Sequence, residues 1–174
     1  MKRLNMKSFF GKKREGAGFT FQAIPSIYVG GDRDGDFSWM EKRPEHADTL
    51  FIFNDNEEQF LAFVRGDRSG FSAGGGNAAI RPLRGEDPPR AAGVPTGRTT
   101  AGRENPGYKN LDGPTKAVIN QSLAVIQELV NTGRYKRLIF SKDKDQETLG
   151  TELYGPVEEV KQYIYDQLKA MMPR

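Results

Sequence analysis

Apolar residues occur along the chain in two patterns, short continuous runs and stripes with helical spacing. The run Leu50-Phe51-Ile52-Phe53 is apolar at every position, which is typical of a strand buried on both faces of a sheet. Over residues 114–131 the apolar positions recur three or four residues apart, at Ile119, Leu123, Ile126 and Val130. The pattern therefore predicts a strand over 48–53 and a helix over 114–131, which Thr132-Gly133 ends.

Further strands and helices are predicted along the rest of the chain. Two strands are predicted at 19–24 and 26–29, on either side of Pro25, and a second inner strand at 91–94, which breaks at Pro95. A last strand is predicted at 136–141, and helices are predicted at 57–64 and 156–170. A strand that follows a long helix implies a parallel neighbour. We therefore expect an α/β fold with three layers, in which a mixed, mostly parallel central sheet carries helices on both faces.

The length of 174 residues fits one domain, and the charge separates a basic arm from it. Residues 1–14 hold six lysines and arginines and no acid, so the net charge of +3 comes from this end of the chain. We expect a flexible arm over 1–16 and a single α/β domain over 17–174. A solubilising leader is the favoured interpretation of the arm, and contact with nucleic acid is the alternative.

Composition excludes several kinds of chemistry. The chain has no cysteine and one histidine, His46, which excludes disulfides, thiol catalysis and multi-histidine metal centres. The acidic segment 30–36 lacks the glycine spacing and the glutamate of a calcium loop, so a turn is the better interpretation. We expect no metal and no cofactor. Without a long apolar stretch or a secretion signal, the sequence predicts a cytoplasmic protein with no membrane partner.

A glycine triplet is the first candidate for a binding site. The backbone amides of Gly74, Gly75 and Gly76 can approach an anion closely because glycine has no Cβ. Asn77 and the Ala-Ala-Ile that follows can begin a helix whose positive end faces that anion. Seven arginines and no lysine lie between residues 65 and 103, a bias that suggests anion recognition: Arg65, Arg68, Arg81, Arg84, Arg90, Arg98 and Arg103.

Polar residues follow the predicted strands where each one ends. Asn54, Asp55 and Asn56 follow the first buried strand, and Ser141-Lys142-Asp143 follow the strand at 136–141. The carboxyl ends of parallel strands are where ligands bind in α/β sheets. Further anion contacts are expected from two small-residue turns, which hold Thr96, Gly97 and Arg98, and Gly150 and Thr151. Trp39 has two open interpretations, a core residue or a platform on which a ring stacks.

Taken in order, these segments resemble the macro-domain family of ADP-ribose-binding modules. Asn54 and Asn56 match the family's asparagine segment, residues 74–77 its first glycine loop and 149–155 its second, although Asp55 replaces a small residue. The match runs from about residue 48 to 168. The Phe-Asn-Asp-Asn, Gly-Gly-Gly-Asn-Ala-Ala-Ile-Arg-Pro and Gly-Val-Pro-Thr-Gly segments also resemble uncharacterised bacterial and phage proteins, which implies a bacterial cytosol or a phage-infected host.

The resemblance implies binding of ADP-ribose or a related nucleotide diphosphate-ribose. The amides of both glycine loops would bind the diphosphate, Arg81 or Arg98 would neutralise it, and Asn54 and Asn56 would bind ribose hydroxyls. If the protein is a hydrolase, an ADP-ribosyl glycosidic bond would be cleaved. Asp55 or Asp143 would then stabilise the cationic ribose or orient a water, and Lys142 would be a candidate nucleophile.

Other interpretations of the same residues stay open. A non-catalytic protein that binds or sequesters a nucleotide second messenger needs the same glycine loops but no catalytic carboxylate. A nucleic-acid-associated protein acting through the basic arm is a third, less favoured hypothesis. Asp55 and Asn56 can also cap the following helix, and Lys142 and Asp143 can form a solvated turn. The sequence does not fix the number of subunits.

Overall fold

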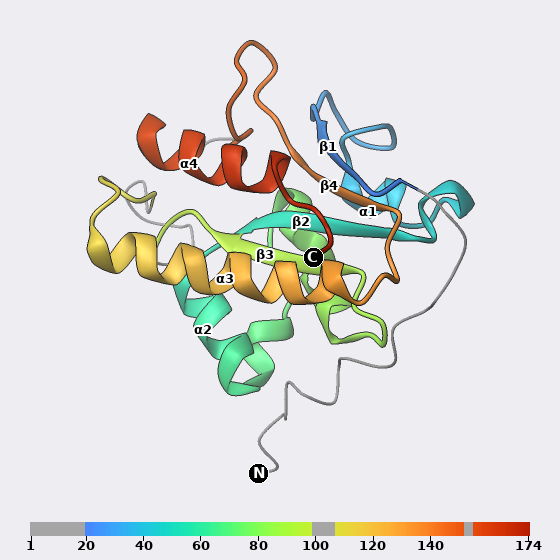
Figure 1. Ribbon diagram of the computed structural model, residues 1–174, viewed down its shortest axis with the longest axis horizontal. Coiled ribbons are helices and arrows are strands. Elements are labelled where there is room, and N and C mark those ends of the chain that lie inside the picture. The colour runs from blue at the N-terminus through green and yellow to red at the C-terminus, as the bar shows by residue number, and fades with distance from the viewer. Residues whose placement is uncertain (1–19, 99–106, 152–154) are drawn as a thin grey trace.

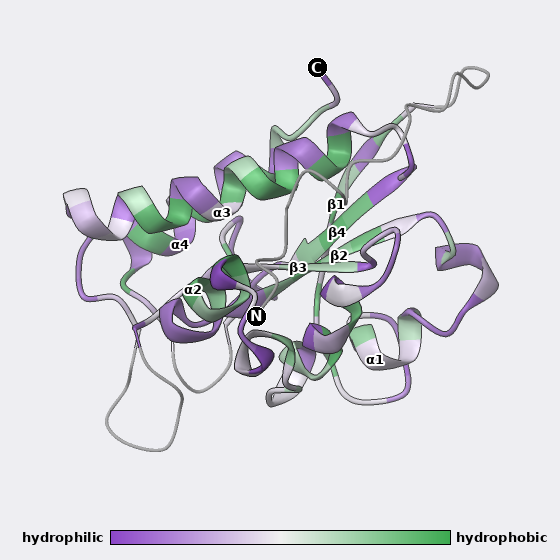
Figure 2. Cartoon of the chain, turned by 90° about the horizontal axis from the view of Figure 1, so that it is seen from below, coloured by the Kyte–Doolittle hydropathy of each residue, from purple (hydrophilic) through white to green (hydrophobic). Residues whose placement is uncertain are grey.

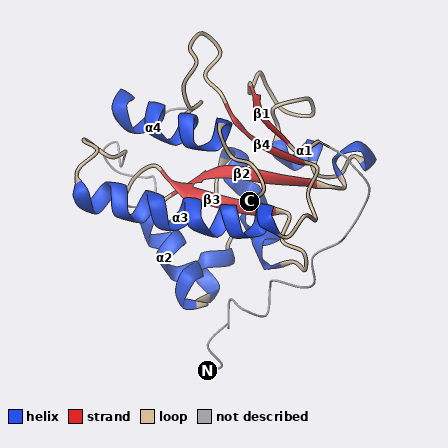
Figure 3. Cartoon of the chain, viewed as in Figure 1, coloured by secondary structure: helices blue, strands red, loops and turns tan. Residues whose placement is uncertain are grey.

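Four parallel strands form the central sheet of the computed structural model, which describes residues 20–98, 107–151 and 155–174. The strands are β1 (Gln22–Ser26), β2 (Thr49–Asp55), β3 (Ala91–Pro95) and β4 (Arg137–Ser141). Their order is β1-β4-β2-β3 (Figure 1, Figure 3). Every strand pair is parallel, so the prediction of a mixed sheet is wrong for the described residues. The predicted arm lies outside them.

Helical segments cover both faces of this sheet. They are α1 (Phe37–Met40), α2 (Glu57–Arg65), α3 (Gly113–Asn131) and α4 (Glu158–Lys169), with the 3₁₀ segments η2 (Pro44–His46), η3 (Arg68–Phe71) and η4 (Gly76–Gly85). Helices α3 and α4 lie together on one face and α1 lies on the other (Figure 2). The α/β class and the helices on both faces are therefore confirmed. None of the helices in the described part of the chain is long and apolar enough to cross a lipid bilayer.

The alternation of side chains along β2 divides the core in two. Leu50 and Ile52 pack in the larger cluster with α3 and α4, and Phe51 and Phe53 pack in the smaller cluster with α1 and η4. Successive side chains of a strand point to opposite faces, and here both faces are covered. Asp55 lies two residues after Phe53 and therefore on the same face of β2 as Phe51 and Phe53, which is the face covered by η4.

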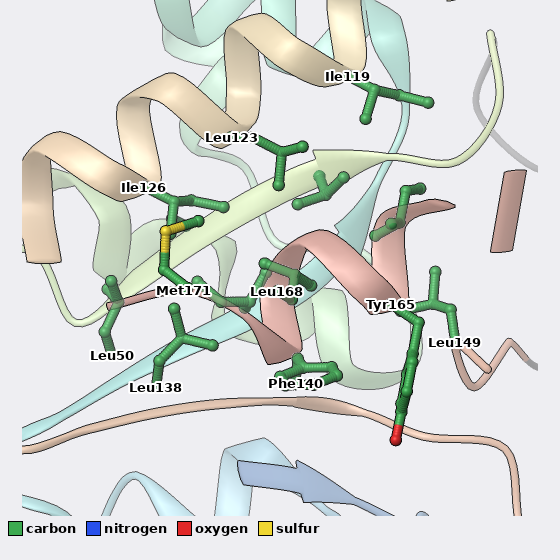
Figure 4. Close-up of a cluster of buried hydrophobic side chains, with 14 of the residues drawn as sticks. Leu50, Ile119, Leu123, Ile126, Leu138, Phe140, Leu149, Tyr165, Leu168 and Met171 are labelled. Atoms are coloured by element: carbon green, nitrogen blue, oxygen red, sulfur yellow. The ribbon is translucent and has the colours of Figure 1, made fainter. Parts of the chain in front are cut away.

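The larger cluster fixes α3 against the sheet. Ile126 of α3 is fully buried with Leu138 of β4 and Leu168 of α4 (Figure 4). The bounds of α3 follow the sequence closely: Asp112 caps it by accepting a hydrogen bond from the Thr115 amide, and Gly133 follows its end in the left-handed conformation. The prediction of this helix and its end is confirmed.

Three predicted elements differ from the structure. Residues 19–24 and 26–29 contribute one strand, β1, in which Pro25 lies opposite Phe140; a proline is tolerated there because β1 is an edge strand. Strand β3 is also at an edge rather than inside the sheet. The helix after the glycine triplet is η4, which is of the 3₁₀ type and contains Pro82.

We predict that Ile126→Ala destabilises the protein by about 2–5 kcal/mol, because it removes a buried side chain and leaves a cavity between α3 and the sheet. Urea unfolding followed by circular dichroism measures the change. Glu128→Ala, two residues along the same helix on its exposed side, is the control and should change stability by less than about 0.5 kcal/mol. Equal effects of the two substitutions would contradict this packing.

Candidate ligand-binding site

A cavity of about 630 Å³ lies at the carboxyl edge of the sheet. Residues from the ends of all four strands line it: Tyr28 follows β1, Asp55 ends β2, Thr96 follows β3 and Lys142 follows β4. The prediction that the exits of the strands at 48–53 and 136–141 lie at one edge is therefore confirmed. The cavity also brings together most of the residues that the sequence singled out: Asn54, Asp55, Asn56, Gly74, Gly75, Gly76, Asn77, Arg81, Thr96, Gly97, Lys142, Asp143, Gly150 and Thr151.

The glycine loop lines one wall of this cavity and keeps two amides available. The Gly74 amide donates to the Ala78 carbonyl at 3.0 Å, and the Ala78 amide donates to Gly75 at 3.1 Å. The amides of Gly75 and Gly76 donate no hydrogen bond to any other described residue. A Cβ at Gly75 would meet nothing within 4 Å, whereas Gly76 has a φ of +53°, which favours glycine. Two of the three predicted amides thus remain free to bind a ligand.

A buried ion-pair cluster lies behind the glycine loop. The Asp55 carboxylate is fully buried; its Oδ1 accepts from Arg81, with Nη2 at 3.0 Å, and its Oδ2 accepts from Arg84 Nη1 at 2.7 Å. Oδ1 also accepts from the Asn56 amide at 2.9 Å. Both oxygens are engaged, so Asp55 has a structural role and we do not retain it as a candidate for catalysis.

Arg84 is the more deeply buried of the two arginines in the cluster. Its guanidinium donates to the carbonyls of Gly70 at 2.5 Å and Gln59 at 3.0 Å, and lies 4.5 Å from the ring centroid of Phe63. Burial lowers the pKa of Arg84, and Asp55 opposes that shift. These contacts join η4 to α2 and η3, so the cluster fixes the loop that precedes η4.

The cluster carries surplus positive charge close to the cavity. Two guanidinium groups face one carboxylate, and Arg81 itself lines the cavity. A Cβ at Gly74 would lie 2.8 Å from Arg81 Nη1, which places this guanidinium directly against the glycine loop. Gly93 of β3 is equally constrained, since a Cβ there would lie 2.6 Å from Asp55 Oδ2. The close packing leaves an electropositive wall that suits an anion.

The segment 142–151, which includes the start of the predicted second glycine loop and is called the second loop below, also lines the cavity and is held by hydrogen bonds. Asn54 Nδ2 donates to the Gly150 carbonyl at 2.8 Å, and the Gly150 amide donates to Ser141 at 3.0 Å. The Lys142 amide donates to Ser26 at 2.8 Å, which ties this loop to the end of β1. Asn54 was predicted to bind a ribose hydroxyl, but its side-chain amide holds the second loop. The Gly150 amide was predicted to bind the diphosphate, but it already donates to Ser141.

Lys142 and Asp143 line the cavity but are partly engaged with their own loop. Lys142 Nζ lies 3.3 Å from Glu147 Oε1, and its side chain is 16% exposed. Asp143 Oδ1 accepts from the amides of Asp145 and Gln146 at 2.8 and 3.1 Å, and these hydrogen bonds lower the pKa of Asp143. Asp143 is therefore ionised at neutral pH.

Two predicted asparagines support the walls. Asn56 Oδ1 caps α2 by accepting from the Gln59 amide at 2.9 Å. Asn77 accepts from the Phe37 amide at 2.9 Å and donates to Gly35 at 3.0 Å, so it joins the glycine loop to the segment before α1. Both residues position backbone around the cavity.

The turn after β3 contributes less than predicted. Thr96 donates through its hydroxyl to the Asp55 carbonyl at 3.2 Å, and Gly97 lines the cavity. Arg98 is exposed and does not line it. The arginine bias has a mainly structural cause in the described residues, since Arg84 binds Asp55, Arg90 binds Glu41 at 3.1 Å, and only Arg81 lines the cavity.

Several lining residues were not predicted as site residues: Ile27, Tyr28, Gln59, Ser72 and Lys144. Ile27 and Tyr28 were missed because β1 was expected to continue through residue 29, whereas it ends at Ser26. The buried Oε1 of Gln59 has no hydrogen-bond partner among the described residues. Among the lining residues, the cations Arg81, Lys142 and Lys144 outnumber the carboxylates Asp55 and Asp143, which favours a ligand with negative charge.

Comparison of the chain with protein-family models, with curated proteins and with solved structures finds no match in any of the three. The resemblance to macro domains therefore stays a prediction.

We predict that Asp55→Asn destabilises the fold by about 3–5 kcal/mol, because two buried guanidinium groups lose their only carboxylate partner in this cluster. Asp67→Asn is the matched control, since Asp67 and Arg65 form an ion pair in which both side chains are exposed. The control should cost less than about 1 kcal/mol. Chemical denaturation of both variants measures the difference, and similar midpoints would contradict a supporting role for Asp55.

Proposed function

We propose that the protein binds a nucleotide diphosphate, of which ADP-ribose is the leading candidate, in the cavity at the carboxyl edge of the sheet. The observation that carries this proposal is the glycine loop, where the free amides of Gly75 and Gly76 lie beside the Arg81 guanidinium. Amides and a guanidinium are the groups with which proteins bind phosphate oxygens.

The charge of the wall suits a diphosphate. Arg81 and Arg84 exceed Asp55 by one positive charge, and that surplus lies in a buried environment where a Coulomb interaction is stronger than in water. Lys142 and Lys144 also line the cavity. Each lies near a carboxylate, Glu147 at 3.3 Å and Asp145 at 3.9 Å respectively. The positive charge that the fold holds in place is therefore that of the arginines beside the glycine loop.

The remaining groups suit a ribose. Asn56 uses only its Oδ1 for capping among the described contacts, which leaves its Nδ2 for a hydroxyl at the end of β2. Gln59 lines the same wall one turn further along α2. The resemblance to macro domains supports ADP-ribose in particular, because that family binds ADP-ribose between two glycine loops.

Binding without cleavage is the form of the proposal that the geometry favours. Asp55 is held by two guanidinium groups and cannot serve as a free base. Asp143 retains Oδ2 for orienting a water, and Lys142 would have to leave Glu147 before it could attack a ribose carbon. Incubation with an ADP-ribosylated peptide, followed by mass spectrometry, separates the two forms: intact substrate indicates a binder, and peptide without ADP-ribose indicates a hydrolase.

We expect ADP-ribose to raise the melting temperature in a panel with NAD, ATP, AMP and cyclic nucleotides. A ligand that binds only the folded state stabilises it by about 2.7 kcal/mol at a hundredfold excess over Kd. For a protein of this size that corresponds to a shift of several degrees. A panel in which no nucleotide shifts the melting temperature would overturn the proposal.

Gly75→Asp should abolish this shift while leaving the fold intact, because a side chain there meets nothing within 4 Å but places a carboxylate among the phosphate-binding amides. Gly113→Asp is the matched control: its Cβ is equally unobstructed, and it lies at the start of α3 outside the cavity. Calorimetric titration should show at least a tenfold loss of affinity for the first variant only. Equal affinities would exclude the glycine loop as the phosphate site.

A further inference from the structure

One aromatic ring lines the cavity and remains exposed. The exposed large hydrophobic residues in the described part of the chain are Tyr28, Val29 and Met172, and Tyr28, which is 43% exposed, is the one that lines the cavity. The half-buried Ile27 beside it adds aliphatic surface. The other lining residues are small, polar or charged, and none of them is aromatic. An exposed aromatic ring at the edge of such a cavity requires an explanation.

The backbone that carries this ring packs closely against Gly35. Gly35 has a φ of +95°, and a Cβ on it would lie 2.1 Å from the Ile27 carbonyl oxygen and 2.8 Å from Tyr28 Cα. Residue 35 therefore packs directly against the segment, and only glycine fits. This contact holds Tyr28 at a defined position next to the cavity.

The same segment is connected to the glycine loop and to the second loop. Asn77 Nδ2 donates to the Gly35 carbonyl at 3.0 Å, which links the glycine loop to the residue that packs against the Tyr28 backbone. On the other side, the Lys142 amide donates to Ser26, two residues before Tyr28. The backbone at Tyr28 thus has a fixed relation to the site proposed for the diphosphate.

Trp39, the other aromatic residue considered as a stacking platform, is not free for that role. It packs against the smaller core cluster, and the Arg43 guanidinium lies 4.1 Å from its ring centroid. Trp39 also does not line the cavity. Of these two rings, Tyr28 is the one with access to a ligand.

We propose that Tyr28 is the base-binding residue of this site and that the nucleobase of the bound nucleotide stacks on its ring. The inference rests on the proposed function, because it adds a base subsite to the diphosphate site. An aromatic face stacks with any nucleobase, so Tyr28 would provide affinity for nucleotides over free phosphates without selecting one base. The hydroxyl group has no part in the stack.

The test is calorimetric titration of the full chain with three probes: ADP-ribose, ADP and inorganic pyrophosphate, which has no base. Tyr28→Ala should weaken binding of ADP-ribose and ADP by about tenfold or more and leave pyrophosphate binding unchanged. Tyr28→Phe should retain wild-type affinity for all three. Val29→Ala is the control, because Val29 is the exposed neighbour that does not line the cavity.

Each outcome decides between the two proposals. Unchanged affinity of Tyr28→Ala for ADP-ribose, in a protein whose wild type binds it, overturns the stack and leaves the diphosphate site standing. An equal loss for pyrophosphate also overturns it, since Tyr28 would then act through the phosphate-binding loops. Failure of the wild-type protein to bind any of the probes overturns the proposed function and the base subsite with it.

Discussion

The buried contact between Asp55 and the two arginines of η4 is the constraint on which the site depends. A carboxylate with no exposure to solvent is stable there only because Arg81 and Arg84 occupy both of its oxygens. The arginines in turn hold carbonyls of Ser72, Gly70 and Gln59. One carboxyl group at the end of β2 therefore positions α2, η3 and the segment that carries the glycine loop.

This arrangement explains how an irregular segment is held in a defined shape. Residues 66–90 contain two 3₁₀ segments and no long helix, so few regular hydrogen bonds organise them. Ionic contacts with the sheet replace that organisation, and the aromatic rings of Phe53 and Phe63 exclude water from them. The surplus positive charge that remains is a property of the scaffold and also the basis of the proposed anion site.

Much of the architecture was predictable from local pattern. The apolar run of β2 and the stripe of α3 identify their elements because both are long and strongly periodic, and Asp112 and Gly133 show where α3 begins and ends. The edge of the sheet at which the cavity lies was also predictable, since it follows from parallel strands. The type of η4 was not, because Pro82 permits either an early helix end or a 3₁₀ segment.

The roles of single polar residues could not be predicted, because they depend on contacts between distant segments. Asp55 meets arginines 26 and 29 residues away, and Asn54 meets Gly150, 96 residues away. The sequence pattern predicted Asn54, Asp55 and Arg81 at the site, where they line the cavity, but it could not distinguish a residue that would touch a ligand from one that supports the wall. Tyr28 was missed for a local reason, a strand end placed three residues too late.

The strand order has a consequence for how the protein forms during synthesis. β4 is the last strand to leave the ribosome, yet it lies between β1 and β2, which have no direct pairing with each other. A nascent chain that stops before Arg137 can pair β2 with β3 but leaves β1 without a partner. The four-stranded sheet, and with it a cavity lined by residues from all four strand ends, is therefore completed only after β4 has been made.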